Sequence, residues 1–228
     1  HAQDSDVEAI NESGALIARE AFGGKEGYVL GGIGPFGGLL EPYGEVTEKS
    51  VREAFAEQAM ALVSGGVDAI IIETQTSLEE LGIGLEAARE AGAPCVIGSM
   101  AYDVTFDGEE IRTMMGIGPE DAAEFMVENG ADVIALNCGS GVDVSWAARA
   151  VERYRRITDL PTMAQPNAGL PELIDMEVVY RQTPEEMTGE LSALLSAGAN
   201  IVGGCCGSSP AHLRLFRKLL DETQGEGS

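Results

Sequence analysis

Residues 66–73 read Gly-Val-Asp-Ala-Ile-Ile-Ile-Glu, residues 130–138 read Gly-Ala-Asp-Val-Ile-Ala-Leu-Asn-Cys, and residues 198–206 read Gly-Ala-Asn-Ile-Val-Gly-Gly-Cys-Cys. In each stretch a glycine ends a helix, and a short apolar strand then begins with a small residue and Asp or Asn. The chain therefore repeats one helix-to-strand junction three times. The residues that follow each strand lie at its carboxyl end, which is where α/β proteins carry their reactive groups.

Short apolar runs alternate with longer amphipathic runs along the rest of the chain. The predicted strands are Tyr28–Ile33, Val67–Ile72, Pro94–Ala101, Asp132–Asn137, Pro161–Gln165 and Asn200–Gly204. The predicted helices are Val7–Phe22, Thr47–Ser64, Leu78–Ala91, Pro119–Asn129, Val142–Ile157, Pro184–Ala197 and Pro210–Leu220. This alternation predicts a parallel sheet with helical crossovers, as either a (β/α)8 barrel or an open doubly wound sheet.

Length and charge limit the classes of protein that fit. The 228 residues suit one domain, predicted at 1–221, with a disordered tail at 222–228. The 38 Asp and Glu against 14 Lys and Arg give a net charge of −24, which repels phosphate backbones. No stretch approaches the ~20 apolar residues of a membrane span. We expect a cytoplasmic protein that binds neither nucleic acid nor membrane.

Three of the four cysteines, Cys138, Cys205 and Cys206, lie at predicted strand ends. Neighbouring cysteines form a disulfide only through a strained ring, and three thiols leave one unpaired. Three thiolates with one open position are typical of catalytic zinc, and thiolates favour zinc over magnesium or calcium. The sequence thus predicts a Zn²⁺ site, with inert buried cysteines as the alternative. Cys95 lies at the opposite strand end and is predicted to pack.

A substrate thiol suits the open position, because zinc coordination ionises a thiol at neutral pH without a protein base. Such a base is hard to find in this sequence. His1 is terminal and His212 lies in the last predicted helix, so a Ser-His-Asp or Cys-His mechanism has little support. No side chain is expected to act as a general acid or base.

Four motifs follow one another in a familiar order and spacing. They are Ile71-Ile-Glu-Thr-Gln-Thr, Leu136-Asn-Cys-Gly, Gln165-Pro-Asn-Ala-Gly-Leu-Pro and Gly203-Gly-Cys-Cys-Gly-Ser-Ser-Pro-Ala-His. Together they resemble the homocysteine-binding domain of the zinc-dependent homocysteine S-methyltransferases, over nearly the whole chain. The resemblance implies a (β/α)8 TIM barrel in which Cys138, Cys205 and Cys206 hold zinc. It also implies methyl transfer from a small-molecule donor to the thiol of homocysteine, which forms methionine.

The resemblance also assigns two substrate-binding residues. Glu73 matches the acidic residue that receives the substrate ammonium, and a carboxylate at a strand end is a suitable anchor for an amino acid. The alternative is a Glu that caps or braces a helix. Asn167 matches a position near the metal, where it would act as a displaceable oxygen ligand. The alternative is a turn residue of Asn-Ala-Gly.

The chain departs from the family pattern at its beginning. Family members open with a strand carrying Asp-Gly-x-x-Gly-Thr and a second strand that ends near Glu-Thr-Asn-Thr, and neither is found here. We therefore expect an N-terminally truncated barrel that lacks its first two strands and keeps six. Two open sheet edges would favour a homo-oligomer or a missing N-terminal segment as a partner.

Two other functions compete with methyl transfer. Gly32-Ile-Gly-Pro-Phe-Gly matches G-x-G-x-x-G, but the next helix is predicted only near Thr47, whereas a dinucleotide site needs the glycines to open the helix directly. The other alternative is a non-catalytic zinc-binding or redox-sensing module that uses the neighbouring cysteines. Within the methyltransferase interpretation, the donor stays open between S-methylmethionine, betaine and methylfolate.

Overall fold

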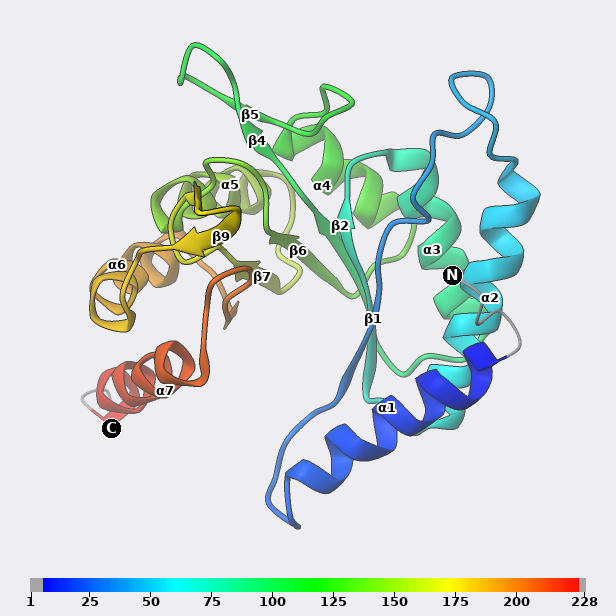
Figure 1. The fold of residues 1–228 in the computed structure, drawn as a ribbon, viewed down its shortest axis with the longest axis horizontal. Coiled ribbons are helices and arrows are strands. Elements are labelled where there is room, and N and C mark those ends of the chain that lie inside the picture. Colours follow the sequence, from blue (N-terminus) through cyan, green and yellow to red (C-terminus); the bar gives the residue numbers. More distant parts are fainter. Residues whose placement is uncertain (1–5, 226–228) are drawn as a thin grey trace. The chain divides into compact units, whose positions relative to one another are not determined.

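The computed structural model describes residues 6–225, which form seven helices and ten strands (Figure 1). The helices are α1 (Val7–Ala21), α2 (Glu48–Ser64), α3 (Leu78–Glu90), α4 (Pro119–Glu128), α5 (Val144–Ile157), α6 (Pro184–Ala197) and α7 (Pro210–Gly225). The strands are β1 (Leu30–Ile33), β2 (Ala69–Gln75), β3 (Val96–Met100), β4 (Asp103–Val104), β5 (Ile111–Arg112), β6 (Val133–Asn137), β7 (Thr162–Gln165), β8 (Pro171–Ile174), β9 (Glu177–Tyr180) and β10 (Ile201–Val202).

All predicted strands and helices are present, with ends that differ by a few residues. The six predicted strands form one sheet in the order β1-β2-β3-β6-β7-β10. The pairs β1–β2, β6–β7 and β7–β10 are parallel. The prediction of a six-stranded partial (β/α)8 barrel is confirmed.

The described chain divides into two compact units. Unit 1 consists of residues 6–99 and 125–133, and unit 2 of residues 100–124 and 134–225. Helix α7 continues to Gly225, four residues beyond the predicted domain end at 221. The last part of the predicted tail, 226–228, lies outside the described residues.

The repeated junction holds neighbouring strands in register. In unit 1, the backbone N–H of Asp68 donates to the carbonyl of Val29 at 2.8 Å, and its carboxylate accepts from the N–H of Val29 at 2.7 Å. Arg19 of α1 donates to this carboxylate at 2.6 Å and to the carbonyl of Gly66 at 3.0 Å. The junction thus ties a helix, a turn and the start of the preceding strand together.

The other two copies use the same contacts. The backbone N–H of Asp132 donates to the carbonyl of Val96 at 2.8 Å, and the Asp132 carboxylate accepts from the N–H of Val96 at 2.8 Å. Arg89 donates to the same carboxylate at 2.9 Å. In unit 2, the backbone N–H of Asn200 donates to the carbonyl of Thr162 at 2.9 Å, and the side-chain oxygen of Asn200 accepts from the N–H of Thr162 at 3.0 Å. The third residue of the repeat therefore acts as a strand clamp, a role that Asp and Asn share because both offer a side-chain oxygen.

Side chains cap the beginnings of three helices, α2, α3 and α6. The side chains of Thr47, Ser77 and Thr183 each accept a hydrogen bond from the N–H three residues later. Since α2 begins at Glu48, well after Gly37, the glycines of the G-x-G-x-x-G match do not open a helix. The local structure of a dinucleotide site is therefore not formed there.

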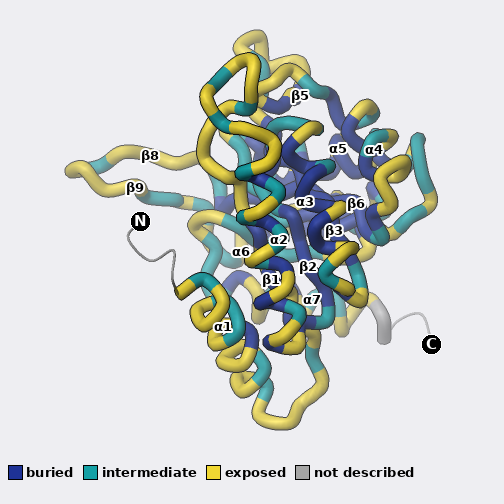
Figure 2. Tube along the Cα trace, turned by 90° about the vertical axis from the view of Figure 1, so that its right-hand side faces the viewer, coloured by how far each residue is buried: buried dark blue, intermediate teal, exposed yellow. Residues whose placement is uncertain are grey.

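Two antiparallel hairpins were not predicted. Strands β4 and β5 have two residues each, and β8 and β9 pair with Leu173 opposite Val178 and Pro171 opposite Tyr180. Figure 2 shows the β8–β9 hairpin as largely exposed, whereas β6 is buried. Both hairpins belong to unit 2, in the segments that follow β3 and β7.

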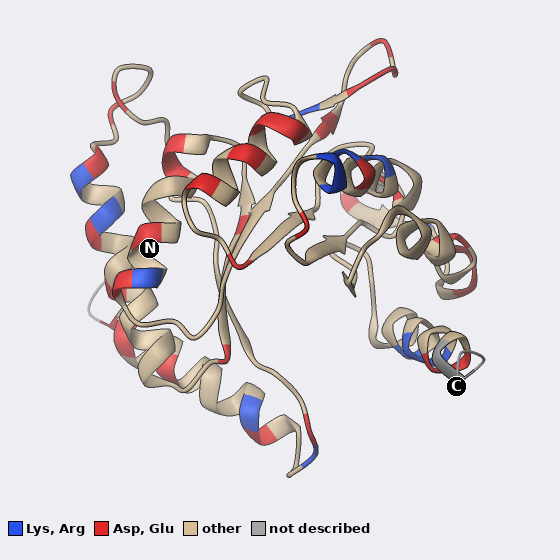
Figure 3. Ribbon diagram, turned by 180° about the vertical axis from the view of Figure 1, so that it is seen from behind, with Lys and Arg blue, Asp and Glu red and all other residues tan. Residues whose placement is uncertain are grey.

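The apolar residues form a core in each unit. In unit 1, α1 packs on α2 and α2 on α3; in unit 2, α5 packs on α6 and α6 on α7. Tyr154 and Met163 are buried in unit 2, and Trp146 is half-buried on α5. Acidic residues are spread over the helices and loops (Figure 3). None of the helices in the described residues is long and apolar enough to cross a bilayer.

Candidate metal centre

Three strands of unit 2 bring the predicted ligands to one edge. Cys138 directly follows β6, Asn167 comes two residues after β7, and Cys205 and Cys206 follow β10. Because β7 pairs in parallel with both β6 and β10, the carboxyl ends of the three strands lie side by side. The parallel topology explains why residues so far apart in sequence meet.

The sulfur atoms of Cys138, Cys205 and Cys206 all lie within 4.8 Å of one another. The Sγ atoms of Cys138 and Cys206 are 3.8 Å apart, and all three thiols are free. Two sulfurs that bind one zinc tetrahedrally, each at about 2.3 Å, are about 3.8 Å apart. The donor set and this spacing fit a zinc ion, and the cluster predicted from the sequence is formed.

The backbone has positive φ angles at Cys138 and at the residue after it. Cys138 has a φ of +61° and Gly139 a φ of +97°. A Cβ atom on Gly139 would lie 1.7 Å from the carbonyl oxygen of Tyr102, so the backbone passes there only without a side chain. A non-glycine residue in the left-handed region is strained, and such strain is commonly found at functional sites.

Asn167 joins the two cysteine loops. Its side-chain oxygen accepts from the backbone N–H of Cys206 at 3.1 Å, and its amide donates to the carbonyl of Gly139 at 3.1 Å. The carbonyl of Cys206 in turn accepts from the N–H of Ala168 at 2.9 Å. Asn167 is buried and lies beside the cluster, where it braces both loops.

The pKa values of Cys138 and Cys205 are shifted in opposite directions. The hydrogen bond from Cys205 lowers the pKa of Cys138 to about 5, with help from the N–H of Gly139 and from Asn167. The same bond, together with burial, raises the pKa of Cys205. The amide of Asn137 also approaches the sulfur of Cys205 at 3.9 Å. The site thus stabilises a thiolate at Cys138, which is the form a metal ligand needs.

Tyr180 and His212 belong to the surroundings of the cluster and were not predicted to do so. Tyr180, the last residue of β9, packs against the residue after Cys206, because a Cβ atom on Gly207 would lie 2.3 Å from its Cγ. Burial, and then the neighbouring Cys206, raise the pKa of Tyr180. His212 is buried, with Nδ1 3.1 Å from the N–H of Ser209 and Nε2 3.1 Å from the carbonyl of Gln182. The apolar pairs on either side of Asp175-Met176 are the signal that would have revealed the hairpin carrying Tyr180.

Glu73 lies on β2 in unit 1, seven residues after the glycine of its repeat. Asn137 and Cys205 hold the same place in the other two copies. A Cβ atom on Gly32 would lie 2.4 Å from its Oε1, so this glycine leaves room for the carboxylate. The role of Glu73 in substrate binding stays a prediction.

Cys95 lies apart from the cluster in the chain and in its chemistry. It comes immediately before β3, at the amino end of that strand, and burial raises the pKa of its thiol. The group of metal-ligating side chains formed by Cys138, Cys205 and Cys206 does not include it. Cys95 therefore serves as a matched control for the cluster.

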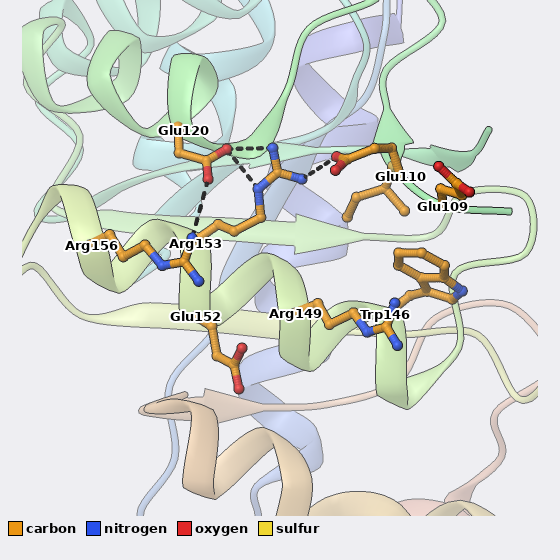
Figure 4. Close-up of a pocket in the computed structure, with 9 residues that line it drawn as sticks. Glu109, Glu110, Glu120, Trp146, Arg149, Glu152, Arg153 and Arg156 are labelled. Carbon is orange, nitrogen blue, oxygen red and sulfur yellow. Dashed lines mark hydrogen bonds and ion pairs between the residues drawn. The ribbon is translucent and has the colours of Figure 1, made fainter. Parts of the chain in front are cut away.

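A separate pocket of about 420 Å³ lies elsewhere in unit 2, and none of the cluster cysteines lines it (Figure 4). Arg153 extends into it from α5 and pairs with Glu110 at 2.9 Å and with Glu120 at 2.6 Å. Arg149 lies over the ring of Trp146, 4.4 Å from its centroid. These contacts brace the β4–β5 hairpin and the start of α4 against α5, which is a structural role.

Comparison with known proteins agrees with the geometry of the cluster. A family model described as homocysteine S-methyltransferase matches residues 1–220. The methionine synthase of Mycobacterium tuberculosis is 36% identical over 219 residues, which cover 91% of this chain and 18% of that protein. The methionine synthase of Mycobacterium leprae is 33% identical over 217 residues, with the same coverage. The chain thus spans less than a fifth of the length of these relatives.

Solved structures show a related fold. The apo form of the homocysteine methyltransferase MmuM from Escherichia coli matches with a TM-score of 0.72 at 18% identity, covering 94% of this chain and 74% of that one. Its metallated form matches with a TM-score of 0.73 at 17% identity, covering 93% and 70%. At this level of identity the likeness shows a shared fold.

Proposed function

Because the chain belongs to the homocysteine S-methyltransferase family, we propose that it takes part in zinc-dependent transfer of a methyl group to the thiol of homocysteine, forming methionine. The observation that carries the proposal is the group of three cysteine sulfurs within 4.8 Å of one another in unit 2. A cluster of this kind offers a metal three anionic ligands and leaves a further position for a substrate.

Cys138, Cys205 and Cys206 would hold the zinc ion. Thiolate ligands select zinc over the harder magnesium and calcium ions. Zinc, when bound, supplies the positive charge that keeps a substrate thiol ionised at neutral pH. This would explain how the reaction proceeds without a protein base beside the cysteines.

The chain's own residues would hold the site and the substrate. Asn167 braces the loops of Cys138 and Cys206, with a displaceable oxygen contact to the metal as its proposed second role. Glu73 would pair with the substrate ammonium, a charge-assisted contact suited to a carboxylate. In the reaction a bond forms between the homocysteine sulfur and the methyl carbon, the methyl bond to the donor breaks, and the thiol proton passes to solvent.

Zinc binding tests the site directly. We expect about one zinc per chain in the wild type, and loss of that zinc in a Cys205→Ala/Cys206→Ala variant, because one thiolate cannot hold the ion alone. Cys95→Ala is the matched control and should keep full zinc content, since Cys95 is not part of the cluster. Full zinc content in the double variant would refute the site.

A second experiment tests the reaction. The zinc-loaded chain is incubated with homocysteine and, in turn, with S-methylmethionine, betaine and methylfolate, and methionine is measured. Methionine from one donor would identify the donor class. Full zinc binding without methionine from any donor would favour the non-catalytic zinc-binding or redox-sensing function.

A further inference from the structure

The loop that directly follows Cys138 lies along β4. The N–H of Ser140 donates to the carboxylate of Asp103 at 2.6 Å, and the carbonyl of Ser140 accepts from the N–H of Val104 at 2.9 Å. A Cβ atom on Gly141 would lie 3.1 Å from Cγ2 of Val104. The loop and β4 are therefore in close contact, although Asp103 and Ser140 are 37 residues apart in the sequence.

Asp103 and Asn167 hold opposite ends of one peptide group in this loop. The carbonyl of Gly139 accepts from the amide of Asn167 at 3.1 Å. The N–H of Ser140, which donates to Asp103, belongs to the same peptide group. In a trans peptide the C=O and the N–H point in opposite directions, so the two side chains approach from opposite sides. The peptide plane cannot turn without breaking one of the two bonds.

The loop needs such contacts because its backbone is unfavourable at the cysteine. Cys138 has a φ of +61°, and a residue with a side chain keeps this conformation only where its surroundings fix it. Gly139 and Gly141 also have positive φ angles, and glycine has the widest choice of conformations when nothing holds it. The bonds to the peptide group between Gly139 and Ser140 thus limit the movement of the Cys138 sulfur.

The segment that carries Asp103 is itself held on both sides. Tyr102, the residue before it, is buried, and its hydroxyl lies 2.7 Å from that of Tyr154 on α5. The Tyr154 hydroxyl donates to the carbonyl of Ala135 on β6 at 3.2 Å. Asp103 also pairs with Arg112 across the β4–β5 hairpin. Asp103 therefore contacts the loop from a segment that the core of unit 2 supports.

Resting on the proposed function, we propose that Asp103 is a positioning residue for the metal centre: its carboxylate holds the loop after Cys138, so that this sulfur stays beside those of Cys205 and Cys206. Asp103 would not bind the metal, since it is not in the group of metal-ligating side chains found among the described residues. Removing a residue that orients a metal ligand usually weakens binding by about 10- to 100-fold. Because Asp103 and Ser140 are exposed and water competes for their bond, we expect about tenfold.

The zinc affinity of three variants, measured by competition with a chromogenic chelator, tests this role. Asp103→Ala should bind zinc about tenfold more weakly than the wild type. Asp103→Asn should bind zinc as the wild type does, because its amide oxygen still accepts from the N–H of Ser140. Asp107→Ala is the matched control. Asp107 is exposed in the same hairpin and accepts from the N–H of Glu109 at 3.1 Å, so this variant loses the same charge and should keep the wild-type affinity.

A spectroscopic measurement separates the position of the sulfur from a general loss of stability. In cobalt-substituted protein at saturating cobalt, the intensity of the sulfur-to-cobalt charge-transfer band rises with the number of bound cysteine sulfurs. Asp103→Ala should lower this intensity toward that of Cys138→Ala. A loss of stability alone would leave the intensity at the wild-type value, and an unchanged band in Asp103→Ala would therefore overturn the inference.

The affinities can also overturn it. A wild-type affinity in Asp103→Ala would show that the bond to Ser140 does not matter for zinc. Equal losses in Asp103→Ala and Asp103→Asn, or in Asp103→Ala and Asp107→Ala, would assign the effect to charge and not to position. A wild-type chain that binds no zinc would overturn the proposed function and this inference together. Zinc binding that depends on Asp103, without methionine from any donor, would overturn the proposed reaction and support this inference.

Discussion

The side-chain oxygen of Asn167 accepts a hydrogen bond from the backbone N–H of Cys206 at 3.1 Å. This bond spans two loops that follow different strands, β7 and β10. Because the amide of Asn167 also holds the carbonyl of Gly139, the spacing of the sulfurs depends on a residue that need not bind the metal itself.

Replacing Asn167 with Ala should weaken zinc binding about 10- to 100-fold, which is the usual effect of removing a residue that orients metal ligands. Competition with a chromogenic chelator measures the affinity. Asn129→Ala, whose side chain makes an exposed hydrogen bond within its own helix turn, controls for loss of an amide. An unchanged zinc affinity in Asn167→Ala would show that the hydrogen bonds of Asn167 to the two cysteine loops are dispensable for zinc binding.

Gly139→Ala should destabilise the protein by more than about 3 kcal/mol, since the new Cβ would overlap the carbonyl of Tyr102 in a backbone that already disfavours side chains. Gly116→Ala is the matched control, because Gly116 also has a positive φ but nothing lies within 4 Å of its Cβ position. That variant should lose only about 1 kcal/mol. Urea unfolding of both variants gives the comparison, and equal losses would contradict it.

Asp68→Asn should alter the pH dependence of stability. The N–H of Val29 and then Arg19 lower the pKa of Asp68 below its ordinary value of 3.8. Ionisation therefore stabilises the fold above pH 3.8, and this contribution is lost as the pH falls through the lower folded value. The free energy of unfolding of the wild type should exceed that of Asp68→Asn by up to about 1 kcal/mol at pH 7, because the carboxylate is partly exposed. The difference should vanish in acid.

Urea unfolding between pH 2.5 and 7 measures this difference. Asn200 shows that an amide can fill the same position of the repeat, so the variant should keep the strand clamp. Asp159→Asn, at an exposed carboxylate, controls for the change in net charge. A difference between wild type and Asp68→Asn that grows on acidification would contradict the sign.

His212→Ala should cost about 1–3 kcal/mol, because removing this buried side chain leaves the carbonyl of Gln182 and the N–H of Ser209 without their partner. Thermal unfolding of the zinc-free chain isolates this effect from metal binding. Arg214→Ala, at an exposed position of the same helix, is the control and should change stability by about 0.5 kcal/mol or less. If both variants melt like the wild type, His212 does not anchor the start of α7.

The repeated junction made the main elements predictable. A glycine, a small residue and then Asp or Asn marked three strand starts, and counting along each strand placed Cys138, Cys205 and Cys206 at carboxyl ends. Parallel topology does the rest, because it brings those ends to one edge. The contacts of Asp68, Asp132 and Asn200 explain why this pattern recurs.

The hairpins of unit 2 and the side chains near the cluster were harder to predict, because their sequence signals are weak. Strands of two residues, such as β4, are too short to show an alternation of apolar and polar residues. In β8–β9 the two-residue turn is Asp175-Met176, which lacks the glycine that commonly marks a hairpin, so the apolar pairs on either side of it were the only sequence signal. Tyr180 packs on Gly207, and His212 bonds the carbonyl of Gln182. Both contacts join residues remote in sequence, and no spacing rule connects them.

The first and last cysteines of the cluster are synthesised at different times. Cys206 lies 68 residues after Cys138. At a synthesis rate of about 5–20 residues per second, Cys138 exists for about 3–14 seconds before its last partner does. The metal cannot be captured by the full set of sulfurs during this interval. A metal that needs all three sulfurs can therefore bind only after the segment that follows β10 has been synthesised.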